Sequence, residues 1–355
     1  MTEATVDRPT TGAGAPADLP LAADLEARLE AHRVELTGYC YRILGSAFEA
    51  EDAVQETFIR AWRNFATFEG RASFRSWLYK IATNVCLDMK SATQRRARPI
   101  DLNPALTADA NLGEPLPDSA WVEPVPDERT ISVGGDPADI AQARESIRLA
   151  FVAALQHLPP KQRAVLILRE VLRWRAEEVA ELLDTSAASV NSALQRARAT
   201  LSAKDLVASD PTPAILDGEH RALLERYVKA FEQYDMDGLT ALLSEDARWS
   251  MPPYELWLQT HRDIVGWCLG PGIGCRGSKL IPVNVNGSPG FAQYKPDPEG
   301  GLAPWSLQAL ELEPDSGRIA GITFFLDTER FFPLFGVPAH LDADGRPDRD
   351  WEQPA

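Results

Sequence analysis

The organisation of this chain is decided by AEDAVQETFIRAWRNFATFEGRASFRSWLYKIATNVCLDMKSATQRR, which spans Ala50–Arg96. Apolar residues recur there at steps of three and four, the period of a helix face, in two separate runs. Between the runs, FATFEGRAS contains Gly70 and Ser73, which indicates a loop that ends in a helix N-cap. The pattern predicts two amphipathic helices whose buried positions are Val54, Phe58, Ala61 and Phe65 in the first and Phe74, Trp77, Leu78, Ile81, Val85 and Met89 in the second.

The charge of the chain is uneven along its length. The net charge of −16 argues at first against a nucleic-acid partner. However, residues 60–98 contain nine Arg or Lys against two acidic residues, about +7, whereas residues 99–140 contain nine acidic residues and one Arg, about −8. A basic block of this size on two helices predicts a surface for phosphate, although a solvated helix face is the alternative.

Length and composition set the remaining limits. The 355 residues suggest two or three domains, and no apolar run approaches the roughly 18 residues that span a membrane. We expect residues 1–20 to be a disordered tail and not a signal peptide, since they have no apolar core. The four cysteines are scattered without a CxxC pair, which argues against a zinc site or a disulfide framework and fits a reduced cytoplasm. We expect no metal site and no cofactor.

EDAVQETFIRAW followed by FRSWLYKIATN resembles region 2 of sigma-70 family sigma factors of the extracytoplasmic-function (ECF) type. The resemblance covers residues 21–98, where a further apolar stripe over Leu19–Leu44 predicts one more helix. It implies that the first helix docks on core RNA polymerase through Asp52, Gln55, Glu56, Arg60 and Arg63. It implies that the loop and second helix open promoter DNA, with the DNA-binding candidates Arg71, Ser73, Arg75, Lys80, Asn84, Lys90, Arg95 and Arg96.

Residues 99–140 form an acidic, Pro-rich linker without a sustained period. Three interpretations stay open: a solvated tether, a shield for the basic helices, or a segment that lies in a basic channel of a partner. Trp121 is the one expected anchor. A second, shorter linker is expected at residues 204–218.

Residues 141–203 predict a second all-α domain that contains a helix-turn-helix, with the turn at residues 184–186 and Ser186 as a cap. LPPKQRAVLILREVLRWRAEEVAELLDTS resembles sigma region 4. Many relatives carry Lys and Arg where this chain has Asn191 and Ala193, so the contacted bases stay open. The outward-facing DNA-binding candidates are Ser189, Asn191, Ser192, Gln195, Arg196 and Arg198. Of these, Arg196 and Arg198 are expected to contact phosphate.

Residues 219–340 predict an α+β domain in which helices precede an antiparallel sheet. ERYVKAFEQYDMDGLTALLSEDARWSMPP, HRDIVGW and GRIAGITFFLD resemble the SnoaL-like polyketide-cyclase family, whose fold is a cone-shaped sheet around a pocket. Asp246, His261 and Asp263 are the candidates for a catalytic acid and base. We favour structural roles for these residues and a regulatory role for the domain over catalysis. Its aromatic residues either line a pocket for a small ligand or fill a closed core. Residues 341–355 are expected to be a flexible acidic tail.

These features predict an alternative sigma factor that is not an enzyme and is modulated by its third domain. Its expected partners are core RNA polymerase and promoter DNA, and the sequence leaves open an anti-sigma factor. Two alternatives remain: a DNA-binding regulator that senses a small ligand, and a cyclase or isomerase fused to a helical module.

Overall fold

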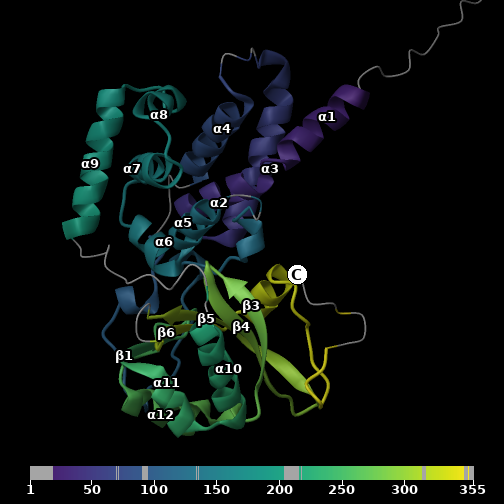
Figure 1. Ribbon diagram of the computed structural model, residues 1–355, viewed down its shortest axis with the longest axis vertical. Helices are drawn as coiled ribbons and strands as arrows, with labels where there is room; N and C mark the ends of the chain where they lie inside the picture. Colours follow the sequence, from purple (N-terminus) through teal and green to yellow (C-terminus); the bar gives the residue numbers. More distant parts are fainter. Residues whose placement is uncertain are drawn as a thin grey trace, which may run out of the picture.

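The computed structural model describes residues 19–68, 70, 72–89, 95–132, 134, 136–203, 216, 218–313, 317–347 and 351. Figure 1 shows the helices of the first two domains packed together above a sheet domain that follows them in the chain. The predicted N-terminal tail up to residue 18 and most of the second linker lie outside the described residues.

The described residues of the first domain form four α-helices. The stripe over Leu19–Leu44 is two helices and not one, because the helix ends at Glu30 and a new one begins at Arg33. Gly45, with a φ of 74°, ends the second. Ser46 and Ser73 each accept a hydrogen bond from the backbone N–H three residues later, so both cap a helix, as predicted for Ser73. The helices are α1 (Leu19–Glu30), α2 (Arg33–Leu44), α3 (Ala47–Asn64) and α4 (Phe74–Met89).

The first linker is not a solvated tether over its described residues. It runs between the helical domains and the sheet domain and is hydrogen-bonded to both. The Leu106 and Leu116 N–H groups donate to Trp257 O and Pro253 O of the sheet domain, and the Glu123 N–H donates to Gly45 O. Trp121 is buried, which confirms the expected anchor. The linker therefore acts as an ordered layer between the two halves.

The second domain contains the predicted helix-turn-helix. A π-helical turn (Ile167–Val171) continues α7, and Ser186 accepts a hydrogen bond from the Ser189 N–H at the start of α9. Asp184 lies in the turn with a φ of 50°. The helices are α5 (Pro137–Ile147), α6 (Leu149–Leu155), α7 (Pro160–Leu166), α8 (Ala176–Leu182) and α9 (Ala187–Ala203).

The third domain is the expected α+β fold around a six-stranded sheet of order β2-β1-β6-β5-β4-β3. The sheet is mixed and not purely antiparallel, because β1 pairs in parallel with β6, the last strand. The strands are β1 (Leu243–Ser250), β2 (Trp257–Leu258), β3 (Lys279–Val285), β4 (Ser288–Pro296), β5 (Leu302–Leu312) and β6 (Ile319–Phe325). The helices are α10 (Gly218–Gln233), α11 (Met236–Leu242), α12 (His261–Leu269) and α13 (Thr328–Leu334).

The predicted flexible tail is partly ordered. Leu341 is buried and exchanges two backbone hydrogen bonds with Leu302 at the start of β5. Residues 342–347 then form a turn in which Asp342 accepts from Arg346 N. The described part of the tail is therefore attached to the sheet at the start of β5.

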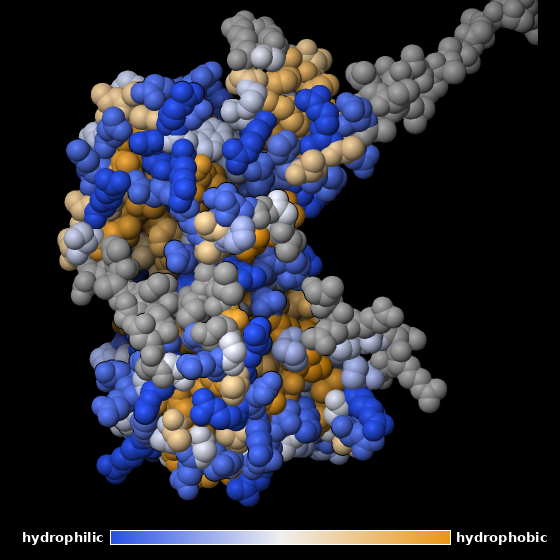
Figure 2. Space-filling view, in the orientation of Figure 1, coloured by the Kyte–Doolittle hydropathy of each residue, from blue (hydrophilic) through white to orange (hydrophobic). Residues whose placement is uncertain are grey.

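Two apolar cores hold the chain together. One lies inside the third domain, between the sheet and α10–α12, and includes Trp249 and Phe291. The other is continuous from α2–α4 through Val125 of the linker and through the second domain to Tyr294, Phe331 and neighbouring residues of the sheet domain. One face of the sheet and α13 are therefore buried against the helical half, at the level where Figure 2 shows the molecule notched on one side.

Candidate polymerase and nucleic-acid interfaces

A groove of about 560 Å³ lies between α1 and α3. Ile59 and Trp62 line it, and they are 38% and 47% exposed. Large apolar side chains left in water on an otherwise polar helix face are typical of a protein-binding surface. Figure 2 shows apolar surface at the upper ends of α3 and α4.

The residues expected to bind polymerase lie along the same helix. Gln55 and Arg63 line the groove and are exposed. Asp52 is exposed beside it, whereas Glu56 is half-buried and accepts from Arg60 Nε at 2.7 Å. Ile59 and Trp62 were missed from the sequence, although both are large apolar residues of α3 that fall outside the predicted stripe.

A second groove, of about 580 Å³, lies between the α3–α4 loop and α8. Phe68 and Trp77 line it, with ring centroids 4.9 Å apart. Ser73 and Lys80 line the same groove, and Asn84 is exposed further along α4. The predicted candidates Arg71 and Lys90 lie outside the described residues.

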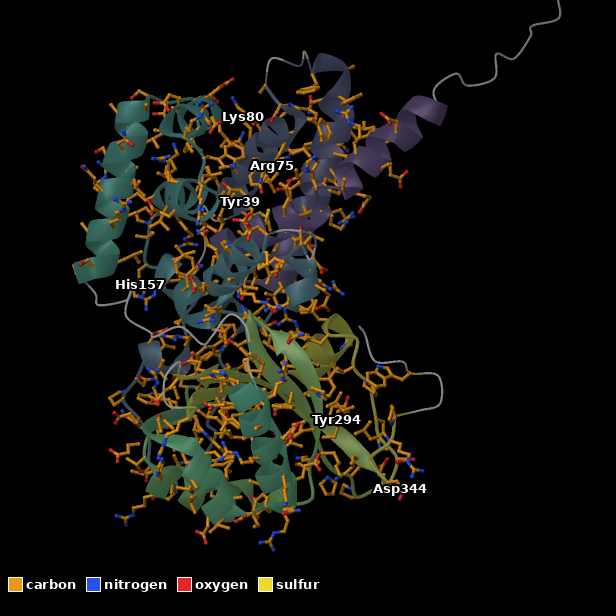
Figure 3. The ribbon with its side chains drawn as sticks, in the orientation of Figure 1. Tyr39, Arg75, Lys80, His157, Tyr294 and Asp344 are labelled. Atoms are coloured by element: carbon orange, nitrogen blue, oxygen red, sulfur yellow. The ribbon has the colours of Figure 1, made fainter. Side chains whose placement is uncertain are left out.

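Two basic residues of α4 are engaged within the chain. Lys80 Nζ lies 2.7 Å from Asp184 Oδ1 in the turn before α9. Arg75 donates to Glu35 at 2.8 Å and covers the Trp174 ring of the second domain. Burial would raise the pKa of Glu35, but Arg75 and His32 lower it overall. Figure 3 shows Arg75 and Lys80 on the side of α4 that faces the second domain.

The structure contradicts one predicted DNA-binding residue, Arg96, which is only 2% exposed. Its guanidinium donates to the carbonyls of Asp118 and Trp121 and to Glu49. The linker folds back over this arginine and supplies those carbonyls, so Arg96 holds the linker in place. Arg95 is exposed, next to His157.

The outer face of α9 is open, as predicted for a recognition helix. Asn191, Gln195, Arg196 and Ser189 are exposed, and Ser192 accepts a hydrogen bond from Arg196. Arg198 is also exposed but pairs with Glu170 at 2.6 Å. This face is therefore able to enter a major groove, with amide side chains that suit adenine edges and arginines that suit phosphate or guanine.

The candidate acid and base residues of the third domain do not converge. Asp246 is exposed, His261 Nε2 bonds Ser244 O at 2.7 Å, and Asp263 accepts from the Ala108 N–H of the linker. An apolar cavity is enclosed by the inner core, and these three residues are not among the described residues that line it. The contacts given for His261 and Asp263 are to backbone groups of β1 and of the linker.

The two halves are joined by the tip of the β3–β4 hairpin. Asn286 and Gly287 both have positive φ, the geometry of the Asn-Gly hairpin turn. Asn286 is buried, and its Nδ2 donates to Tyr41 Oη at 2.6 Å and to Ile147 O at 2.7 Å. Its Oδ1 accepts from the Val125 N–H. One side chain thus connects both helical domains and the linker to the sheet domain.

A charged cluster lies beside this hairpin tip. Arg330 of α13 pairs with the linker residues Glu123 and Asp118, at 3.0 Å and 2.7 Å. Glu123 is buried and also accepts from Ser46, the cap of α3. Burial raises the pKa of Glu123, against the effects of Ser46, Arg96 and Arg330. We call the Asn286 contacts and this cluster the junction.

Asp127 lies beside the junction and accepts from the hairpin tip, and we expect it to make folding stability depend on pH. Burial raises its pKa to about 6, although the Gly287 N–H, which donates to it at 2.7 Å, and Arg144 oppose the shift. Between about pH 4 and 6 the folded chain keeps a proton that the unfolded chain has released, so stability falls as pH rises through this window. The Asp127→Asn variant keeps an acceptor for the Gly287 N–H but cannot titrate. We expect its free energy of unfolding to fall by about 2 kcal/mol less than that of the unmodified chain as the pH rises through this window.

Urea unfolding at pH 4.5 and 7.5 measures the effect. Asp109→Asn is the matched control, because Asp109 lies in the same linker with its side chain exposed. An Asp127→Asn chain that keeps the pH slope of the unmodified chain would contradict the assignment.

Comparison with known families accounts for both helical domains. Residues 29–96 match the family model of sigma-70 region 2, and residues 148–201 match that of sigma-70 region 4. The two helical domains are therefore those of the sigma-70 class of transcription initiation factors. No helix in the described part of the chain has the length and hydropathy needed to cross a membrane.

The chain belongs to the ECF RNA polymerase sigma factors, the alternative sigma factors that direct core RNA polymerase to promoter DNA and initiate transcription. It is 43% identical to ECF RNA polymerase sigma factor SigG of Mycobacterium tuberculosis over 326 residues, which cover 90% of this chain and 85% of SigG. It is 32% identical to SigJ of the same organism over 219 residues, 61% of either chain. The crystal structure of SigJ has a TM-score of 0.54 at 23% identity and covers 86% of this chain and 98% of SigJ, which shows a shared fold.

Proposed function

We propose that this sigma factor binds core polymerase through the α1–α3 groove, opens DNA with the α3–α4 loop and α4, and reads duplex DNA with α9. The main support for this polymerase-binding site is that Ile59 and Trp62 are exposed in a groove on the region 2 helices. The same role leads us to infer a cytoplasmic location. The assignment of α9 is supported by its exposed polar face.

We further propose that the free chain is held in a closed state. The groove beside the α3–α4 loop is also lined by Glu178 and Glu181 of α8, and Lys80 pairs with Asp184. These acidic side chains of the second domain therefore occupy the position beside Lys80 that a DNA strand would take. Region 2 and region 4 contact different promoter elements, so they must separate before transcription starts.

The third domain is proposed to regulate this separation and not to catalyse a reaction. Its sheet shares a core with both helical domains, and its hairpin tip bonds to both of them. Asp246, His261 and Asp263 lie apart from the residues that line its cavity, which supports the absence of catalysis. An enzyme assay of the unmodified chain with cyclase or isomerase substrates is expected to show no turnover.

Base readout by α9 is tested by single substitutions. We expect Asn191→Ala to weaken binding to the cognate promoter about tenfold, the effect of losing one base contact, and to relax preference at one position. Arg196→Ala is expected to weaken binding uniformly across sequences and to lower its salt dependence, because it contacts phosphate. Filter binding of the holoenzyme to a set of single-base promoter variants separates the two.

Run-off transcription with purified core enzyme tests the function itself. Thr200→Ala is the control for the two α9 substitutions, because the Thr200 hydroxyl donates to Arg196 O within the helix. The alternative, a regulator that senses a ligand without acting as a sigma factor, predicts specific duplex binding without polymerase. It also predicts no promoter-dependent transcript on any template, and that pair of results would overturn the proposal.

A further inference from the structure

One DNA-binding candidate of α9, Arg198, is held by an acidic residue of its own domain. Its Nη2 lies 2.6 Å from Oε1 of Glu170, and the two side chains are 61% and 41% exposed. Arg198 follows Asn191 by seven residues and Gln195 by three, so these side chains lie on one stripe of the helix. Figure 1 shows α9 at the outer edge of the second domain. Glu170 therefore engages the cation at the end of the stripe that we expect to face the bases.

Glu170 is placed beside α9 by other parts of the fold. It lies in the π-helical turn Ile167–Val171, which continues α7. Its backbone carbonyl accepts a hydrogen bond from Gln142 Nε2 of α5 at 3.1 Å. Turns of this kind are rare and occur frequently at functional sites. The position of Glu170 therefore depends on α5 and α7 as well as on its contact with Arg198.

A carboxylate and a phosphate are alternative partners for the same guanidinium. Both accept charge-assisted hydrogen bonds from arginine, so a DNA phosphate competes with Glu170 for Arg198. Exposed ion pairs contribute little, because water and salt screen them. A phosphate is therefore able to displace Glu170, but the displaced carboxylate stays beside α9 and repels the DNA strand.

The charge of the helix-turn-helix makes this single pair important. Residues 167–203 contain five Arg, no Lys and five acidic residues, so their net charge is zero. Attraction to phosphate is the main sequence-independent contribution to DNA affinity. A region without net positive charge depends on which of its arginines are available to DNA.

We propose that Glu170 limits the DNA affinity of this sigma factor by competing with a DNA phosphate for Arg198. The inference rests on the proposed reading of duplex DNA by α9. Glu170 acts on DNA through Arg198, so it is a positioning residue and not itself a DNA contact.

Salt-dependent binding of the holoenzyme to its promoter tests this competition. We expect Glu170→Gln, which keeps the shape of the side chain, to bind about threefold more tightly. The slope of log affinity against log salt concentration should steepen by about 0.9, because one more phosphate contact releases one more counterion. Arg198→Gln in the Glu170→Gln chain should return the slope to that of the unmodified chain. Filter binding at several salt concentrations measures both quantities.

Glu177→Gln is the matched control, because Glu177 is exposed at the start of α8 and its neighbour Arg175 stays paired with Glu178. It removes the same charge from the same helix-turn-helix and should leave the slope unchanged. A gain in slope that survives Arg198→Gln, or that Glu177→Gln reproduces, would be a general effect of charge and would overturn the proposal. Weaker binding by Glu170→Gln would overturn it as well.

Failure of the proposed function gives a different result. If α9 does not read DNA, Asn191→Ala, Arg196→Ala and Glu170→Gln all leave promoter binding unchanged, and both proposals fall. If Asn191→Ala weakens binding while Glu170→Gln changes neither affinity nor slope, only the competition is refuted. Glu170, Glu177 and Arg198 are exposed, so each variant is expected to fold normally, which urea unfolding checks.

Discussion

Replacing Trp62 with alanine is expected to weaken binding of core RNA polymerase about thirtyfold, or about 2 kcal/mol, the usual size of a hot-spot truncation. Trp62 lines the α1–α3 groove and is 47% exposed. It therefore contributes little to the fold, and its loss should leave the free energy of unfolding within about 0.5 kcal/mol of its original value. Fluorescence anisotropy of labelled chain titrated with core enzyme measures the affinity.

Leu269→Ala is the matched control, because Leu269 is also a large exposed apolar residue but lies on α12 of the third domain. We expect this control to bind core enzyme normally. Asp52→Lys is expected to have a smaller effect that fades with added salt, since it changes an exposed charge at the edge of the interface. Equal affinities for Trp62→Ala and the unmodified chain would place the polymerase elsewhere.

Asn286→Ala should lower the free energy of unfolding by about 3 kcal/mol, because it leaves the Val125 N–H and the Ile147 carbonyl in the junction without this hydrogen-bond partner. The left-handed backbone at Asn286 adds to the cost, since alanine adopts it less readily. If the junction keeps the chain closed, the same change should raise run-off transcription at a saturating concentration of core enzyme. Urea unfolding and transcription are measured on the same preparations.

Asn284→Ala provides the control, since Asn284 lies two residues earlier on β3 with its side chain exposed. It should change neither reading. A destabilised Asn286→Ala chain with unchanged transcription would support the junction and reject its regulatory role. Deleting the third domain is a poorer test, because it would also uncover the apolar core that the two halves share.

Local patterns were sufficient to predict most of the architecture. The helix stripes of α3 and α4, the caps at Ser73 and Ser186 and the turn before α9 depend on neighbours three or four residues away, so they can be read directly. The order of helices and strands predicted the α+β domain. The parallel pairing of β1 with β6 could not be read, because strands 69 or more residues apart carry no mark of their register.

Only those residues of the two candidate interfaces that follow a local pattern could be predicted from the sequence. The face of α9 follows from helix periodicity, but the burial of Arg96 depends on carbonyls of a linker that has no periodic pattern. Ile59 and Trp62 were available as apolar residues off the stripe of α3. Asn286-Gly287 was available as a hairpin signal, yet nothing local shows that its tip would contact Tyr41.

The continuous core has a consequence for synthesis. The apolar surface of the helical half is completed by residues from Val285 to Leu341, which leave the ribosome after both helical domains. At roughly 5–20 residues per second, the helical domains wait for several seconds with an uncovered apolar face. During that interval the nascent chain is a natural client for chaperones, and its sigma domains are free to meet polymerase before the third domain has closed over them.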